Sequence, residues 1–128
     1  MNKLIVDAAR DKIFLTLIVS RDIYTCSHEN SKINFERLMI IINGFINNNK
    51  VTLDQVDAIY VNRGPGSFAG IRNSLATIKA LFLIKKIDYY CFSFNDFIES
   101  KRSKYEDVPE LCEEFKIKKN LINPIYLS

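Results

Sequence analysis

Short apolar runs dominate the first quarter of the chain. KLIVDAA (residues 3–9) and DKIFLTLIVS (residues 11–20) have the length and composition of buried strands, and DIYTCSH (residues 22–28) is a shorter candidate. The breaks between them, at Arg10–Asp11 and Arg21–Asp22, leave room only for tight turns. This spacing predicts an antiparallel meander of three strands joined by hairpins.

The hydrophobic period then changes to that of a helix. NFERLMIIINGFINNN (residues 34–49) carries apolar side chains at spacings of three and four, which predicts one amphipathic helix. Ser31 or Asn34 is the expected N-cap, and the asparagines at 47–49 are expected to end the helix. The predicted apolar stripe consists of Phe35, Leu38, Met39, Ile42, Phe45 and Ile46.

Two strand–helix units follow. VDAIYV (residues 56–61) and DYYCFS (88–93) are typical of strands, SFAGIRNSLATIKALFLIKK (67–86) of a long helix, and FNDFIESKRS (94–103) of a shorter one. Strands that are joined through a helix lie parallel, with a right-handed crossover. The predicted order is β-β-β-α-β-α-β-α, an α/β fold with a mixed five-stranded sheet covered by helices.

The pattern weakens after Ser100. A short helix is expected near residues 110–115, and LINPIYLS (121–128) is expected to be extended because Pro124 cannot lie inside a helix. We therefore predict a domain over residues 1–100 and a short segment, 101–128, packed on it.

Composition excludes several classes of function. The 128 residues are 48% hydrophobic and carry a formal net charge of +3, which does not by itself indicate a nucleic-acid-binding protein. Three cysteines without a CxxC pair and one histidine, His28, argue against a zinc site or a disulfide framework. No apolar stretch approaches the ~20 residues of a membrane span. We expect a cytoplasmic protein with no membrane contact and no metal or other cofactor.

The segment NRGPGSFAGIR (residues 62–72) holds three of the four glycines and lies between a predicted strand and a predicted helix. Such turns often bind phosphate. A P-loop, however, needs a lysine and a hydroxyl residue after its last glycine, and neither follows Gly70. The dinucleotide pattern GxGxxG fails because Gly70 comes one position too late, and Pro65 has no N–H to offer.

Two interpretations of this turn remain. An acyl-coenzyme A loop begins like Arg63–Ser67, although Phe68 stands where a small residue is needed, so a small acyl-coenzyme A or nucleotide-binding enzyme that uses the turn at 64–70 is the alternative function. The structural interpretation is favoured: Gly64 and Gly66 permit positive φ in a tight turn, and Ser67 caps the helix.

The second predicted helix has more than one apolar side. One stripe contains Ile71, Leu75, Ile78 and Phe82, and a second contains Ala69, Ala76, Ala80 and Leu83. A helix on one face of a sheet needs a single stripe, so the second predicts contact with the first helix or with another protein.

The sequence shows no catalytic constellation. Asp7 ends the first strand, where its carboxylate either binds a metal or water or caps the hairpin turn.

The stretch LDQVDAIYVNRGPGSFAGIRNSLATIKAL (residues 53–81) resembles the TsaB (YeaZ) family. LIVDAA, Glu36–Leu38 and the terminal NPIYLS also resemble family segments, so that the resemblance covers about residues 3–95 and the last few. Ala69 and Asn73 depart from the family pattern, as do Ala8 and Ala9. The positions in register are Asp57, Ile59, Val61, Gly64–Phe68, Gly70–Arg72 and Lys79.

The resemblance implies a ribonuclease H-like (actin-like ATPase) fold and a non-catalytic scaffold role in the synthesis of N6-threonylcarbamoyladenosine at position 37 of tRNAs that read ANN codons. It implies a heterodimer with the catalytic subunit TsaD through the first and second helices, TsaE as a further partner, a homodimer as an option when the chain is alone, and only indirect contact with tRNA. Family members usually have a second domain, and residues 101–128 are expected to be a short remnant of it.

The resemblance and the second apolar stripe together define the expected site residues. The turn is expected to be structural and to consist of Gly64, Pro65, Gly66 and Ser67. The expected partner interface consists of Phe35, Leu38, Met39, Ile42, Phe68, Ala69, Gly70, Arg72, Asn73, Ala76 and Ala80.

Overall fold

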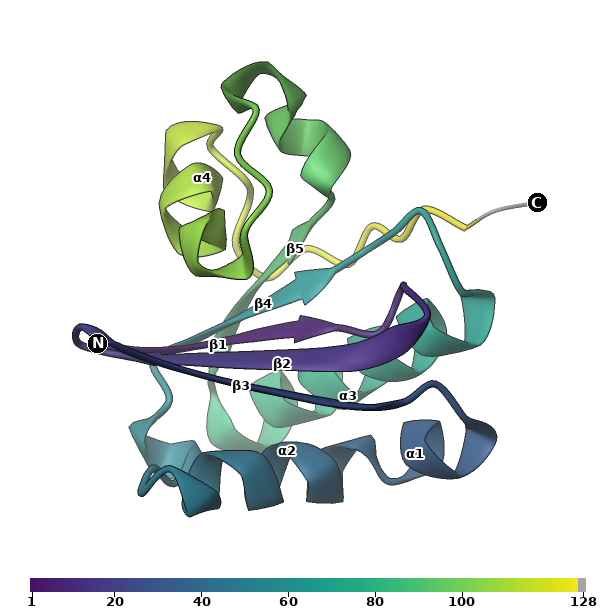
Figure 1. Ribbon diagram of the computed structural model, residues 1–128, viewed down its shortest axis with the longest axis vertical. Coiled ribbons are helices and arrows are strands. Elements are labelled where there is room, and N and C mark those ends of the chain that lie inside the picture. Colours follow the sequence, from purple (N-terminus) through teal and green to yellow (C-terminus); the bar gives the residue numbers. More distant parts are fainter. Residues whose placement is uncertain (127–128) are drawn as a thin grey trace.

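A five-stranded mixed sheet lies at the centre of the molecule in the computed structural model, which describes residues 1–126 (Figure 1). The strand order is β3-β2-β1-β4-β5, with β1–β2 and β2–β3 antiparallel and β1–β4 and β4–β5 parallel. This arrangement confirms the predicted meander and the predicted α/β fold. The strands are β1 (Asn2–Asp7), β2 (Lys12–Val19), β3 (Asp22–Glu29), β4 (Ala58–Asn62) and β5 (Asp88–Phe92).

The single helix predicted over residues 34–49 is two helices, α1 (Lys32–Glu36) and α2 (Leu38–Asn48). Arg37 separates them with non-helical dihedrals, φ −104° and ψ 16°. Ser31 is the N-cap of α1, as predicted, and its hydroxyl accepts from the N–H of Asn34 at 3.2 Å. Because the apolar spacing continues through Arg37, periodicity alone does not reveal this break.

Helix α3 (Phe68–Lys85) connects β4 to β5 and confirms the predicted crossover. Together with α1 and α2 it covers the lower face of the sheet in Figure 1. Apolar side chains from β1, β2, β4 and β5 meet the buried stripe of these helices there. We call this layer the α3-side core; its members include Leu4, Val6, Leu15, Leu38, Ile42, Ile59, Ile71, Leu75 and Ile78.

The other face of the sheet is covered by the segment after β5. The predicted helix at 94–103 is a 3₁₀ helix, η2 (Phe94–Ser100), followed by η3 (Tyr105–Asp107) and α4 (Val108–Glu114). Helix α4 confirms the short helix expected near 110–115. We call the layer between α4 and the sheet the α4-side core; it consists of Ile5, Ala58, Tyr60, Phe92, Phe97, Val108, Leu111 and Cys112.

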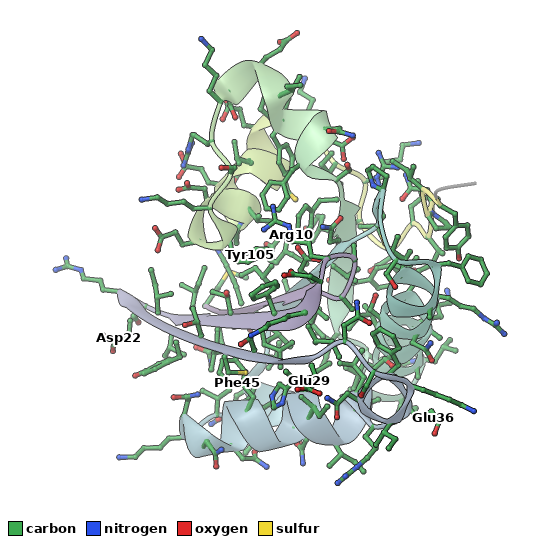
Figure 2. The ribbon with its side chains drawn as sticks, turned by 45° about the vertical axis from the view of Figure 1, so that its right-hand side comes forward. Arg10, Asp22, Glu29, Glu36, Phe45 and Tyr105 are labelled. Atoms are coloured by element: carbon green, nitrogen blue, oxygen red, sulfur yellow. The ribbon has the colours of Figure 1, made fainter. Side chains whose placement is uncertain are left out.

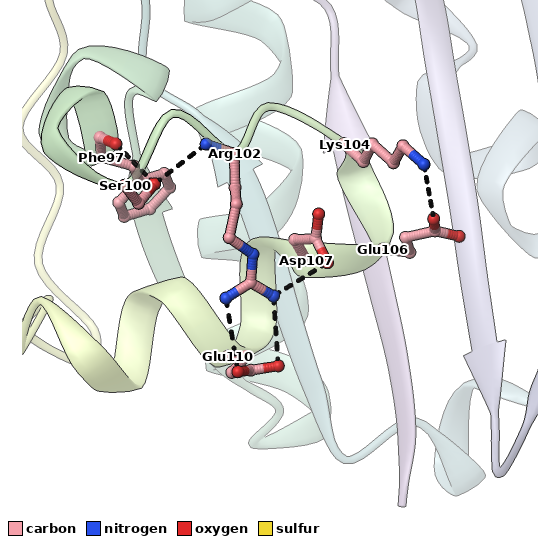
Figure 3. A network of polar contacts seen from close by, with 7 residues as sticks. All are labelled: Phe97, Ser100, Arg102, Lys104, Glu106, Asp107 and Glu110. Atoms are coloured by element: carbon pink, nitrogen blue, oxygen red, sulfur yellow. Dashed lines mark hydrogen bonds and ion pairs between the residues drawn. The ribbon is translucent and has the colours of Figure 1, made fainter.

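Arg102 links the short helices above the sheet, as Figure 3 shows. Its guanidinium donates to Asp107 at 2.9 Å and to both carboxylate oxygens of Glu110 at 3.3 Å. Its backbone N–H donates to the hydroxyl of Ser100 at 3.1 Å, and that hydroxyl donates to the carbonyl of Phe97 at 2.7 Å. These contacts connect the end of η2 to the first turn of α4.

The last described residues are extended, as predicted. Asn120 is bonded to the backbone of Tyr89 in both directions, at 2.8 and 2.9 Å, so this segment runs beside β5. Farther on, the N–H of Ile125 donates to the carbonyl of Arg63 at 2.7 Å. Leu127 and Ser128, which end the predicted LINPIYLS segment, lie outside the described residues. Among the helices of residues 1–126, none has the length and hydropathy that crossing a bilayer requires.

Candidate functional site

The glycine turn between β4 and α3 confirms part of the structural interpretation. Gly64 has φ +108°, a conformation that favours glycine. Gly66 was expected to share it, but among the described glycines only Gly64 has positive φ. Gly66 is needed for a different reason: a Cβ there would overlap the carbonyl group of Ala9. The turn therefore lies directly against the β1–β2 hairpin.

Several N–H groups of this turn are bonded within the chain. Gly64 donates to the side-chain oxygen of Asn62 at 2.9 Å, and Ser67 donates to the carbonyl of Ala9 at 2.9 Å. The hydroxyl of Ser67 accepts from the N–H of Gly70 at 3.1 Å, which confirms Ser67 as the N-cap of α3. A phosphate loop would direct such donors at its ligand. Their internal use counts against the acyl-coenzyme A and nucleotide interpretation.

The extended C-terminal segment covers the outer side of the same turn. A Cβ at Gly64 would overlap the carbonyl oxygen of Ile125, and the ring of Tyr126 lies 4.7 Å from that of Phe68. Arg63 is held from two sides, by Asp96 at 2.8 Å and by the carbonyl of Asn123 at 3.2 Å. The contact between Arg63 and Asn123 joins residues 60 positions apart. It carries no local sequence signal, and the sequence analysis did not predict it.

The backbone that Gly70 approaches closely belongs to the same chain. We expected the small residues of the second helix, Gly70 among them, to admit the backbone of a partner. Gly70 is instead buried, and a Cβ there would overlap the carbonyl oxygen of Ala8. The backbone that approaches α3 at this point is therefore the end of the chain's own first strand.

The expected partner residues divide by exposure. Leu38, Ile42 and Gly70 are buried, so a partner would not reach them in this structure, whereas Phe35 keeps 7% of its surface exposed. The remaining residues lie at the surface, and they include the three alanines of the second stripe that the pattern predicted for α3. Exposed are Phe68, Ala69, Arg72 and Ala76, and half-buried are Met39, Asn73 and Ala80. We call these seven residues the α3 face.

A shallow cavity of about 250 Å³ adjoins this face between α1 and α3. Its lining includes Phe35, Ala69 and Asn73 from the expected interface, together with Lys32 and Glu36. Phe35 thus contributes to a groove that also includes the exposed Ala69. At the far end of α3, Leu83 and Ile84 are also exposed.

Asp7 has a structural role at the end of β1. Its carboxylate is buried and accepts from the N–H of Ala9 at 3.0 Å, which makes it a cap of the hairpin turn. It also accepts from the hydroxyl of Tyr105 at 2.6 Å, and Arg10 lies 3.8 Å away. Figure 2 shows Arg10 beside Tyr105 over the hairpin. Burial, and then the neighbouring Asp7, raises the pKa of Tyr105.

Of the two roles considered for Asp7, the structure shows the cap. Residues 1–126 contain no group of three or more His, Cys, Asp or Glu side chains placed to hold a metal ion. His28 is half-buried on β3, and its Nε2 lies 3.7 Å from the thiol of Cys26.

The sheet order and the crossover helix define a ribonuclease H-like α/β domain. Among solved structures, YeaZ from Pseudomonas aeruginosa superposes with a TM-score of 0.66 at 22% identity, over 72% of this chain and 43% of that one. RuvC from Thermus thermophilus, solved with a Holliday junction substrate, superposes with a TM-score of 0.56 at 9% identity, over 90% of this chain and 78% of that one. These likenesses confirm the fold.

Sequence comparison identifies the family. The family model described as "TsaD: tRNA N6-adenosine threonylcarbamoyltransferase" matches residues 29–94, and the chain belongs to this family as one of its TsaB (YeaZ) proteins. A curated relative, the tRNA threonylcarbamoyladenosine biosynthesis protein TsaB of Buchnera aphidicola subsp. Schizaphis graminum, is 28% identical over 90 residues. That alignment covers 70% of this chain and 43% of the relative, so the chain spans less than half of the relative's length.

Proposed function

We propose that this protein is a non-catalytic scaffold subunit in the synthesis of N6-threonylcarbamoyladenosine in tRNA, and that it binds and supports the catalytic subunit TsaD. The observation that carries the proposal is the α3 face, which contains the alanines of a second stripe on a helix whose first stripe already packs in the core. Membership in the TsaB proteins supports the pathway, since the curated relative is named for threonylcarbamoyladenosine biosynthesis.

The α3 face has the character of a helix-packing surface. Ala69 and Ala76 are small and exposed, so a partner helix can approach the backbone of α3 closely. The exposed ring of Phe68, 54% accessible and steadied by Tyr126, supplies an aromatic anchor at one end. Arg72 adds a charged group at the edge of this strip. An exposed apolar strip bordered by polar groups is typical of an interaction site.

The α3 face also determines how we expect the other partners to bind. A homodimer that forms when the chain is alone would use this face and would compete with TsaD for it. TsaE is then a ligand of the heterodimer, and tRNA is reached through the complex as a whole. We place the protein in the cytoplasm with that assembly.

The direct test is association with TsaD from the same organism, measured by calorimetry on purified proteins. We expect a 1:1 complex. Ala76→Arg adds a long charged side chain to the centre of the α3 face at little cost in helix propensity, and it should weaken binding at least tenfold. Ser103→Arg, on an exposed position above the opposite sheet face, is the matched control and should bind as the parent does.

Two results would overturn the proposal. One is a folded protein that shows no association with TsaD at micromolar concentration. The other is an Ala76→Arg variant that binds with unchanged affinity.

The alternative, an acyl-coenzyme A or nucleotide-binding enzyme that uses the turn at 64–70, has a separate test. Calorimetry with coenzyme A and with ATP would favour it if either bound more tightly than ~10 μM, about −7 kcal/mol. We expect no such binding, because Ser67 and Gly70 already use their N–H groups within the chain.

A further inference from the structure

Another cavity lies away from the glycine turn and the α3 face. It has a volume of about 340 Å³ and opens between the sheet and α4. Lys3, Tyr60 and Tyr90 line it from the sheet, and Cys112, Glu113 and Lys116 line it from α4 and the turn after it. Because it shares no residue with the α3 face, its occupation is independent of the proposed function.

Strand register brings the sheet residues of this cavity together. Tyr60 on β4 is paired with Ile5 on β1 and with Tyr90 on β5, so the two tyrosines are cross-strand neighbours on one face. Their rings stack at 5.0 Å with an interplanar angle of 10°. Lys3 lies two residues before Ile5 and therefore projects from the same face. The result is an aromatic pair with a cation beside it.

The side-chain donors of Lys3, Tyr60, Tyr90 and Lys116 have no hydrogen-bond or ion-pair partner in the part of the chain that the structure describes. Tyr60 is only 6% exposed, yet within residues 1–126 neither its hydroxyl nor that of Tyr90 takes part in a hydrogen bond. The ammonium groups of Lys3 and Lys116 likewise form no ion pair with any described carboxylate. Both tyrosines line the cavity, so their hydroxyls are available to donate to an acceptor bound there.

We propose that this cavity binds a small molecule through a phosphate or carboxylate group. Two lysines outweigh the single carboxylate of Glu113, so the site carries a net positive charge. An ionised phosphate or carboxylate accepts several hydrogen bonds at once, and bonds to such groups are stronger than those to neutral acceptors. The phenols of Tyr60 and Tyr90 complete a set of donors that a single anionic group can satisfy.

The test is an amide NMR titration of the whole chain with inorganic phosphate and, separately, with succinate. Potassium chloride at matched ionic strength serves as the reference. We expect saturable shifts at Lys3, Tyr60, Tyr90 and Lys116 with a Kd of about 1 mM or lower for at least one probe. Phosphate binding without succinate binding assigns a phosphorylated ligand, and the reverse assigns a carboxylate. Shifts that follow ionic strength alone for both probes would overturn the proposal.

Charge variants test both the direction and the magnitude of the expected change in binding affinity. The double variant Lys3→Gln/Lys116→Gln should weaken binding at least tenfold, whereas Glu113→Gln should tighten it several-fold because it removes a repelling carboxylate. Tyr60→Phe should weaken it severalfold with the fold retained. Lys12→Gln, an exposed lysine at the start of β2, is the control and should change nothing. Equal affinity in the double variant and the parent would overturn the site.

Discussion

The hydroxyl of Tyr105 donates a 2.6 Å hydrogen bond to the buried carboxylate of Asp7, across a separation of 98 residues. The bond fastens the segment above the sheet to the end of the first strand. Asp7 also caps the β1–β2 hairpin, and that hairpin contacts both Gly66 and Gly70. One carboxylate thus connects the upper layer, the first hairpin and the glycine turn.

Tyr105→Phe removes this bond and leaves part of a buried carboxylate without its partner. We expect a loss of about 1 to 3 kcal/mol in the free energy of unfolding, measured by urea denaturation at neutral pH. Tyr24→Phe is the matched control, because the half-buried Tyr24 makes no hydrogen bond through its hydroxyl in the described structure. A Tyr105→Phe variant as stable as Tyr24→Phe would show that the bond contributes nothing to stability.

Gly70→Ala and Gly44→Ala should change stability in opposite directions. A Cβ at Gly70 would overlap the carbonyl of Ala8, so the variant must shift α3 or the hairpin and should lose about 1 to 3 kcal/mol. Gly44 lies in α2, where a Cβ would have no neighbour within 4 Å, so alanine there should gain about 0.5 to 1 kcal/mol. Thermal unfolding of both variants measures the difference.

The Gly70 and Gly44 variants also show which substitutions can be used to test the α3 face. A large residue at Gly70 would disturb the fold first, so weakened binding of TsaD would not report on the interface. Equal thermal stability of Gly70→Ala and the parent would contradict the close approach of Ala8.

The end of α3 offers another matched pair. Lys86 follows the helix with φ 60°, in the left-handed region that glycine adopts without strain, and its N–H donates to the carbonyl of Phe82 at 3.0 Å. Lys86→Gly should therefore stabilise the protein by about 0.5 to 1 kcal/mol. Lys85→Gly replaces the last residue of the helix and also removes its 3.1 Å ion pair with Asp54, so it should cost up to about 1 kcal/mol. Urea midpoints with opposite shifts would support this reasoning, whereas a loss of stability in both variants would contradict it.

Stability should fall in alkaline solution. Burial raises the pKa of the Cys91 thiol to about 11 and that of Cys112 to about 12, and it also raises the pKa of Tyr60 and Tyr105. In the unfolded chain these thiols and phenols would lose protons first, so the folded state binds more protons at high pH. The contribution is complete below about pH 8 and is lost as pH rises through the folded pKa values.

The measurement is the urea midpoint in the presence of a reductant. It should be constant from about pH 6 to 8 and decline from about pH 9 upward. A Cys112→Ala variant, less stable at neutral pH because of its cavity, should show a smaller decline. A midpoint that stays flat to pH 10 in the parent would contradict the raised pKa values.

Local pattern was sufficient for most of the elements. The three-strand meander follows from short apolar runs with very short breaks, and α3 follows from an apolar stripe that begins after Ser67. Its second stripe was also visible in the spacing of the alanines. These features depend on neighbours in sequence, where periodicity carries the information.

Contacts between residues that are far apart in the sequence could not be predicted from the sequence pattern. The apolar spacing runs through Arg37 without interruption, so the break between α1 and α2 gave no signal. The glycine pattern identified a tight turn but not what presses on it, because the approach of Ala8 to Gly70 and of Ile125 to Gly64 depends on tertiary packing. The donors gathered around Tyr60 come from separate segments of the chain.

The sheet separates the interior into the α3-side core and the α4-side core, and β1 serves both, with Leu4 and Val6 in one and Ile5 in the other. Within residues 1–126 the two clusters of buried side chains share no member. Mutations in opposite layers should therefore add in their effect on stability. A protein built in this way has two separate interiors that are joined at Asp7 and Tyr105, and the layer that supports the α3 face should keep its packing when apolar side chains above the sheet are changed.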